Sequence, residues 1–70
     1  MDFPEPSSLL SAEYDPSTHH LTVAFRRSGN RYRYSDIERE TYEDLCDAPS
    51  PGTYLARYIK DIYPVKKLSG

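Results

Sequence analysis

The segment LTVAFRRSGNRYRY, residues 21–34, has the pattern of two β-strands joined by a polar turn. Apolar side chains alternate with polar or small ones from Leu21 to Phe25, and Tyr32 and Tyr34 alternate with arginines in the same way. A period of two is typical of strands that bury one face. The residues Ser28-Gly29-Asn30 tolerate the positive φ angles that hairpin turns require. The segment therefore predicts a β-hairpin.

The length of the turn determines which face of the sheet carries Tyr32 and Tyr34. A loop of two or four residues places both tyrosines on the face of Val23 and Phe25, whereas a loop of three or five residues reverses them. Buried, they would pack under helices; reversed, their rings could stack on unpaired bases. We favour an even loop because unpaired guanidinium groups require water, and this arrangement leaves three of them exposed, on Arg26, Arg31 and Arg33.

A further strand is predicted before the hairpin, at Ser8–Tyr14, with inward side chains on Leu10, Ala12 and Tyr14. The segment Asp15-Pro16-Ser17-Thr18 has the composition of a turn, because proline sets φ and the aspartate side chain can accept a backbone N–H. The hairpin strands are expected at residues 20–27 and 31–35. Three strands with short links predict an antiparallel meander.

After the hairpin, the apolar spacing changes to about 3.6 residues, which predicts helices. The first is expected at Glu38–Asp47, after a capping-box pattern at residues 35–38, with Asp36 as the alternative cap. The second has Ser50 as its N-cap and Pro51 at its first helical position, and it would end before Pro64. The apolar stripes comprise Ile37, Thr41, Tyr42, Leu45 and Cys46 in the first helix, and Tyr54, Leu55, Tyr58, Ile59 and Ile62 in the second.

The predicted fold is therefore α+β, with a three-stranded antiparallel meander and both helices on one face, in the order β-β-β-α-α. A chain of 70 residues has room for one domain, with a core expected at residues 8–63 and flexible segments at 1–7 and 64–70. No apolar leader or membrane span is apparent, and Cys46 is the single cysteine. We therefore expect a protein of the reducing cytoplasm without a disulfide and without membrane contact.

The residues that usually carry catalysis or metal binding are not arranged for either here. His19 and His20 are adjacent on a strand, so they would point to opposite faces, and no cysteine or histidine stands at ligand spacing. Cys46 lies on an apolar helix stripe with no base within evident reach, and the glycines are scattered. We expect no enzyme activity, no metal and no cofactor.

The net charge is −2, but the basic residues are clustered in two groups. One group lies around the hairpin turn (Arg26, Arg27, Arg31 and Arg33), and the other lies near the C-terminus (Arg57, Lys60, Lys66 and Lys67). If the two groups meet on one surface, an anionic partner could dock there; if they do not, they are ordinary solvated faces or pair with neighbouring acids.

Several motifs occur in an order that resembles the KTSC domain family: Leu21-Thr22-Val23-Ala24-Phe25, Tyr32-Arg33-Tyr34, Tyr42-Glu43-Asp44-Leu45 and Ala48-Pro49-Ser50-Pro51-Gly52-Thr53-Tyr54. The family is named from the C-terminal extension of some lysyl-tRNA synthetases and also occurs as small stand-alone bacterial and phage proteins. The resemblance runs from Ser7 to Tyr63, with departures at Glu38, Pro51 and Leu55-Ala56. For function, it implies RNA binding, a suggestion rather than an established activity of the family.

We therefore expect a small non-enzymatic binding module whose partner is RNA or another nucleic acid. Arginines suit phosphate contacts, and tyrosines can stack on bases or brace the surface. The predicted binding residues are Arg26, Arg27, Arg31, Tyr32, Arg33, Tyr34 and Lys60. The alternative is a module that binds a protein, or a second copy of itself, through an exposed sheet face or edge strand.

Overall fold

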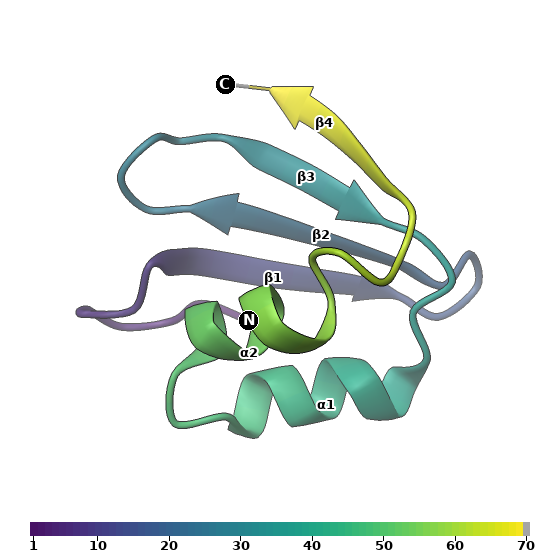
Figure 1. The fold of residues 1–70 in the computed structure, drawn as a ribbon, viewed down its shortest axis with the longest axis horizontal. Coiled ribbons are helices and arrows are strands. Elements are labelled where there is room, and N and C mark those ends of the chain that lie inside the picture. The colour runs from purple at the N-terminus through teal and green to yellow at the C-terminus, as the bar shows by residue number, and fades with distance from the viewer. Residues whose placement is uncertain (70) are drawn as a thin grey trace.

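The computed structural model describes residues 1–69, which form one antiparallel sheet with two helices on one of its faces (Figure 1). The sheet has four strands in the order β1-β2-β3-β4. The elements are β1 (Leu9–Asp15), β2 (His20–Phe25), β3 (Arg31–Tyr34), α1 (Arg39–Asp47), α2 (Pro51–Tyr58) and β4 (Val65–Ser69). The α+β class, the meander and the position of the helices are confirmed, and the sheet is one strand larger than expected.

The hairpin turn places the tyrosines as the even-loop hypothesis requires. The amide of Phe25 donates to the carbonyl of Asn30 over 2.9 Å, so the loop contains the four residues Arg26–Gly29. Gly29 has φ +73°, a left-handed conformation in which glycine carries no steric penalty. Tyr32 lies opposite Val23, and the next inward pair continues the same register. The predicted distribution of side chains between the two faces is confirmed.

The C-terminal segment, expected to be flexible, is instead strand β4. Val65 lies opposite Tyr34, and the amide of Ser35 donates to the carbonyl of Pro64 over 2.9 Å. The segment has no alternating pattern, but strand pairing uses backbone groups, and β3 presents an unpaired row of them to the chain as it leaves α2. Gly70 lies outside the described residues.

The N-terminal segment is also ordered, contrary to the expectation of a flexible lead-in. Phe3 is buried, its amide donates to the carbonyl of Leu10 over 2.9 Å, and the amide of Ala12 donates to the carbonyl of Met1 over 2.8 Å. These bonds lie on the side of β1 that faces away from β2. The segment thus covers one edge of the sheet, and the burial of one aromatic ring stabilises its position.

The inward side of β1 differs from the prediction at one residue. Leu9 is buried, whereas Leu10, expected inside, is 44% exposed. The register of β1 against β2 shifts between Leu9 and Ser11, so an extra residue is accommodated there as a bulge. A bulge reverses the alternation locally, and Ala12 is buried as predicted.

The helix α1 lies where it was predicted to within one residue, whereas α2 is shorter than predicted. The N-cap of α1 is Glu38, and its side chain makes no capping hydrogen bond, so the expected capping box does not form. The backbone amide of Ser35 instead donates to the carbonyl of Pro64, the residue before β4. Asp36 has φ +64°, a left-handed conformation that is neither helical nor that of an N-cap residue. The helix α2 begins at Ser50-Pro51 as predicted but ends at Tyr58. Two residues of its predicted apolar stripe are exposed, Tyr58 by 55% and Ile62, which lies beyond the helix, by 65%.

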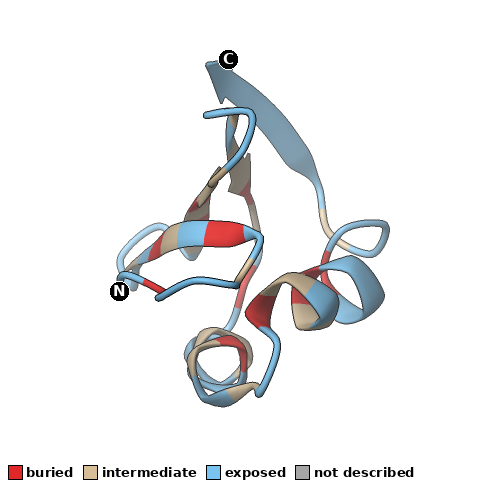
Figure 2. Cartoon of the chain, turned by 90° about the vertical axis from the view of Figure 1, so that its left-hand side faces the viewer, coloured by how far each residue is buried: buried red, intermediate tan, exposed pale blue. Residues whose placement is uncertain are grey.

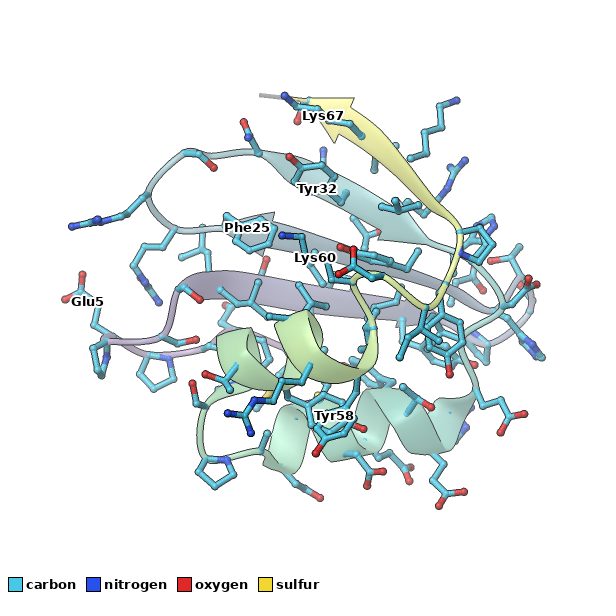
Figure 3. The ribbon with its side chains drawn as sticks, in the orientation of Figure 1. Glu5, Phe25, Tyr32, Tyr58, Lys60 and Lys67 are labelled. Atoms are coloured by element: carbon cyan, nitrogen blue, oxygen red, sulfur yellow. The ribbon has the colours of Figure 1, made fainter. Side chains whose placement is uncertain are left out.

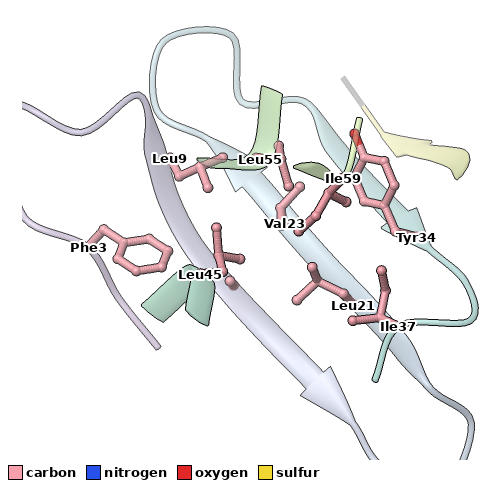
Figure 4. Packing of buried hydrophobic residues seen from close by; sticks show 10 residues of the cluster. Phe3, Leu9, Leu21, Val23, Tyr34, Ile37, Leu45, Leu55 and Ile59 are labelled. Carbon is pink, nitrogen blue, oxygen red and sulfur yellow. The ribbon is translucent and has the colours of Figure 1, made fainter. Parts of the chain in front are cut away.

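The core lies between the helices and the inner face of the first three strands (Figure 4). Its members come from every part of the chain except β4: Phe3, Leu9, Ala12, Leu21, Val23, Tyr34, Ile37, Leu45, Leu55 and Ile59. Figure 2 shows these buried positions on the surfaces where sheet and helices meet, whereas β4 is exposed along its whole length. The helices and β1–β3 therefore provide the packing, and β4 is held mainly by its pairing with β3.

Candidate nucleic-acid interface

The face of the sheet that the helices leave uncovered carries basic side chains from β3 and β4. Side chains alternate along a strand, so Arg31 and Arg33 point away from the face that holds Tyr34 in the core. Lys66 lies directly opposite Arg33 in the β3–β4 pairing, and directly paired residues point to the same side. We call Arg31, Arg33 and Lys66 the basic face. One residue of the C-terminal basic group, Lys66, thus lies beside two residues of the hairpin group.

The surroundings of the basic face leave its charges uncompensated. Arg33 is paired with Thr22 on β2, and the next residue outward across the sheet is Glu13 on β1. Within residues 1–69, no lysine or arginine side chain forms a salt bridge with a carboxylate. The Nε atom of Arg33 is buried and makes no hydrogen bond within the same residues. Arg31 and Lys66 are exposed, and cationic groups that lack a paired carboxylate on the surface favour an anionic partner.

Arg26 has a structural position that the sequence did not indicate. Its guanidinium donates to the carbonyl oxygen of Ser7 through Nε, over 3.0 Å, and to that of Phe3 through Nη2. Its backbone amide donates to the carbonyl of Ser8 over 2.9 Å. Expected in water at the turn, Arg26 is in fact half-buried and joins the hairpin to the N-terminal segment. Arg27, its neighbour in the loop, is exposed.

The remaining predicted residues line a groove on the opposite face of the sheet. Its volume is about 580 Å³, and it lies beside α2, with Phe25, Tyr32, Tyr34, Leu55, Lys60 and Val65 among its lining residues. Figure 3 shows Phe25, Tyr32 and Lys60 near one another on this side. The rings of Phe25 and Tyr32 meet edge to face, with centroids 5.7 Å apart. The structure therefore separates the tyrosines from Arg31 and Arg33.

The two tyrosines differ in burial. Tyr34 is only 3% exposed, and burial raises the pKa of its hydroxyl. Tyr32 is half-buried, and its hydroxyl accepts a hydrogen bond from Nδ2 of Asn30 over 3.4 Å. Both rings pack against the core or its margin, as aromatic residues with a polar end commonly do. The two rings thus pack β3 against the core on the face opposite Arg31 and Arg33.

Sequence analysis placed Lys66 in the basic group near the C-terminus but not among the predicted binding residues. Its position opposite Arg33 was not foreseen, because the segment was interpreted as a flexible tail. The only available signal was the unpaired edge that a three-stranded meander leaves on its last strand.

The groups considered for metal binding do not assemble. Within residues 1–69, no three histidine, cysteine or acidic side chains lie close enough together to hold a metal ion. His19 has φ +60°, and its carbonyl accepts a hydrogen bond from the amide of Ile37 over 3.0 Å. Its backbone therefore ties the turn between β1 and β2 to the segment that precedes α1. No helix among the same residues is long and apolar enough to cross a membrane.

Comparisons with known proteins show the class of domain that this sheet and helix arrangement defines. The model of the KTSC domain family matches residues 5–63. A crystal structure of a KTSC domain protein from Yersinia pestis superposes with a TM-score of 0.85 and 28% identity, covering 99% of this chain and 97% of that protein. The chain therefore belongs to the KTSC domain family, as its motifs indicated.

Relatives occur both inside an enzyme and as small proteins. Lysine–tRNA ligases from a Nostoc species and from Nostoc punctiforme are 36% and 35% identical over 66 residues. The match covers 94% of this chain but only 12% of either ligase. A protein from Tsukamurella paurometabola is 32% identical over 56 residues, which cover 80% of this chain and 82% of that protein.

Proposed function

We propose that the protein is a small non-catalytic module that binds RNA through the basic face of β3 and β4. The observation that carries the proposal is the pairing of β3 with β4, which places Lys66 opposite Arg33 and joins two separate basic segments on one open surface. An arginine presents a planar fork of donors that matches phosphate oxygens. The basic face can therefore contact successive phosphates of a nucleic-acid strand.

The comparisons support RNA as the nucleic acid. The ligases that contain a similar segment act, by name, on tRNA, and this segment is a small part of each. A small sheet with exposed cations could supply backbone contacts without sequence reading, since phosphate contacts position a protein but do not specify a base. Arg27, which is exposed in the hairpin turn, can extend the contact.

The tyrosines have a bracing role in this proposal. Stacking on unpaired bases would require Tyr34 to leave the core. Arg31 and Arg33, its neighbours on β3, would still point to the other side of the sheet. The contact is therefore mainly electrostatic. Such binding depends strongly on salt, because each neutralised phosphate releases counterions.

The test is a titration of fluorescently labelled single-stranded RNA, followed by anisotropy across a series of salt concentrations. Three phosphate contacts predict that log K falls against log salt with a slope of about −2. The double variant Arg31→Gln/Arg33→Gln should lose most of the binding and reduce the slope to about −0.7. The matched control is Arg39→Gln, an exposed arginine at the start of α1, which should leave the slope unchanged. Absence of binding at low salt, or equal binding by both variants, would contradict the proposal.

A further inference from the structure

The two edges of the sheet are finished differently. The outer side of β1 is covered by the N-terminal segment through backbone bonds at Leu10 and Ala12. The outer side of β4 has no neighbour among residues 1–69, and every residue of the strand is exposed. We propose that this free edge of β4 binds an acidic, extended segment of another protein by β-strand addition.

The register of β4 identifies the backbone groups that would make the contact. Ser35 donates to the carbonyl of Pro64, so this pair directs its polar groups across the β3–β4 gap. Backbone direction alternates along an antiparallel ladder, so Lys66 also faces β3. The groups of Val65 and Lys67 consequently point outward, where an added strand can pair with them. Main-chain pairing of this kind supplies the affinity of strand addition.

Charge selects the added strand. Lys66 and Lys67 are adjacent, so one points to the uncovered face and the other to the face of Tyr32, which lies opposite Lys67. A segment with two neighbouring acidic residues would place one carboxylate beside each lysine, because its side chains alternate in the same way. Val65 and Leu68, which are 50% and 37% exposed, can contact apolar residues on either side of the acidic pair.

The same lysines disfavour a second copy of this chain as the occupant. Antiparallel pairing of β4 with itself around Lys67 would bring the two copies of Lys67 opposite each other on the new ladder, and like charges in direct opposition are destabilising. Lysines on edge strands are a common means of preventing such self-pairing. The lysines therefore disfavour pairing of β4 with a second copy of itself and favour pairing with a negatively charged strand.

The first experiment titrates the labelled peptide acetyl-Ser-Thr-Val-Glu-Glu-Val-Thr-Ser-amide, with a control peptide in which both glutamates are lysines. We expect binding of the acidic peptide with a Kd below about 1 mM, and no binding of the control. Lys67→Pro removes an outward N–H without touching the bonds to β3, and should weaken binding about tenfold. Lys67→Gln keeps the N–H and should weaken it about two- to fivefold.

Amide hydrogen exchange in the unmodified protein provides a second measurement that does not depend on a proline variant folding. The amides of Val65 and Lys67 should exchange quickly in the free protein and slowly with the acidic peptide, whereas the amide of Lys66 should be protected in both states. Failure of the peptide to bind, or binding without protection of Val65 and Lys67, would overturn the proposal.

The remaining occupants give distinct results. A doubled molar mass in light scattering, lost in Lys67→Pro, would assign the edge to a second copy and overturn the proposal. Protection of the amides of Val65 and Lys67 by single-stranded RNA instead of the peptide would assign it to nucleic acid, with the same consequence. The variant Arg31→Gln/Arg33→Gln should retain peptide binding, so this inference and the RNA proposal can fail separately.

Discussion

Strands β2 and β3 have two faces with opposite roles, and alternate residues of the same short strands form them. On the inner face, Leu21, Val23 and Tyr34 are buried beneath the helices. On the outer face, Thr22 and Arg33 lie opposite each other and are only half-buried. The comparison shows how a very small domain can separate stability from binding: alternate residues of one hairpin serve the core and the proposed interface, so each can be changed without the other.

The largest expected effect is on the inner face. Leu21→Ala removes a side chain from the centre of the core and should lower the free energy of unfolding by about 2–5 kcal/mol. Thr22→Ala, one residue away on the outer face, should change it by no more than about 0.5 kcal/mol. Urea unfolding followed by circular dichroism measures both. Similar losses for the two variants would mean that the faces are not separated as the register indicates.

A second test concerns the arginine that belongs to neither face. Arg26→Met removes the donors to the carbonyls of Ser7 and Phe3 and should cost about 1–3 kcal/mol of unfolding free energy. Arg27→Met, an exposed position in the same loop, is the matched control and should cost little. Chemical denaturation compares them. If Arg26→Met were as stable as the unmodified protein, the hydrogen bonds of Arg26 to the N-terminal segment would not contribute to the free energy of unfolding.

The smallest expected effect is a change in the free energy of unfolding with pH in the alkaline range. It arises from Tyr42 of α1, which packs against the core. Burial, followed by the neighbouring Cys46 thiol, raises the pKa of Tyr42 from 10.0 to about 12. The folded state then holds this proton more tightly than the unfolded state, so the contribution is complete below pH 10.0 and is lost as the pH rises toward about 12.

Denaturation at a series of pH values in this window should therefore show stability falling with pH, and the fall should be smaller in Tyr42→Phe. Phenylalanine retains the ring that stacks on Tyr14, with centroids 5.2 Å apart, but has no proton to lose. An identical pH profile for both proteins would show that Tyr42 titrates as it does in the unfolded chain.

The hairpin and its two faces could be predicted because they depend on periodicity. The alternation of Leu21, Val23 and Phe25 with polar residues, and the glycine in the turn, contain the information directly. The class of fold and the start of α2 at Ser50-Pro51 follow from similarly local signals. The separation of the tyrosines from Arg31 and Arg33 could be predicted for the same reason.

Features that depend on backbone pairing with a distant segment could not be predicted. Strand β4 and the N-terminal segment are held to the sheet largely by main-chain bonds, which leave no periodic trace in the side chains. The bulge between Leu9 and Ser11 lies where the N-terminal segment bonds to β1, and Arg26 contacts Ser7 of the same segment. The candidate site was therefore only partly predicted: Arg31 and Arg33 lie on the basic face, Arg26 is structural, and Lys66 was supplied by an unforeseen strand.

The most direct test of the two-face account is an NMR titration of the protein with single-stranded RNA at low salt. The account predicts that the largest shift changes occur at Arg31, Arg33 and Lys66, with the core signals of Leu21 and Leu45 unchanged. Largest changes at Phe25, Tyr32 and Lys60 would place the ligand in the groove beside α2, and would contradict the assignment of binding to the uncovered face.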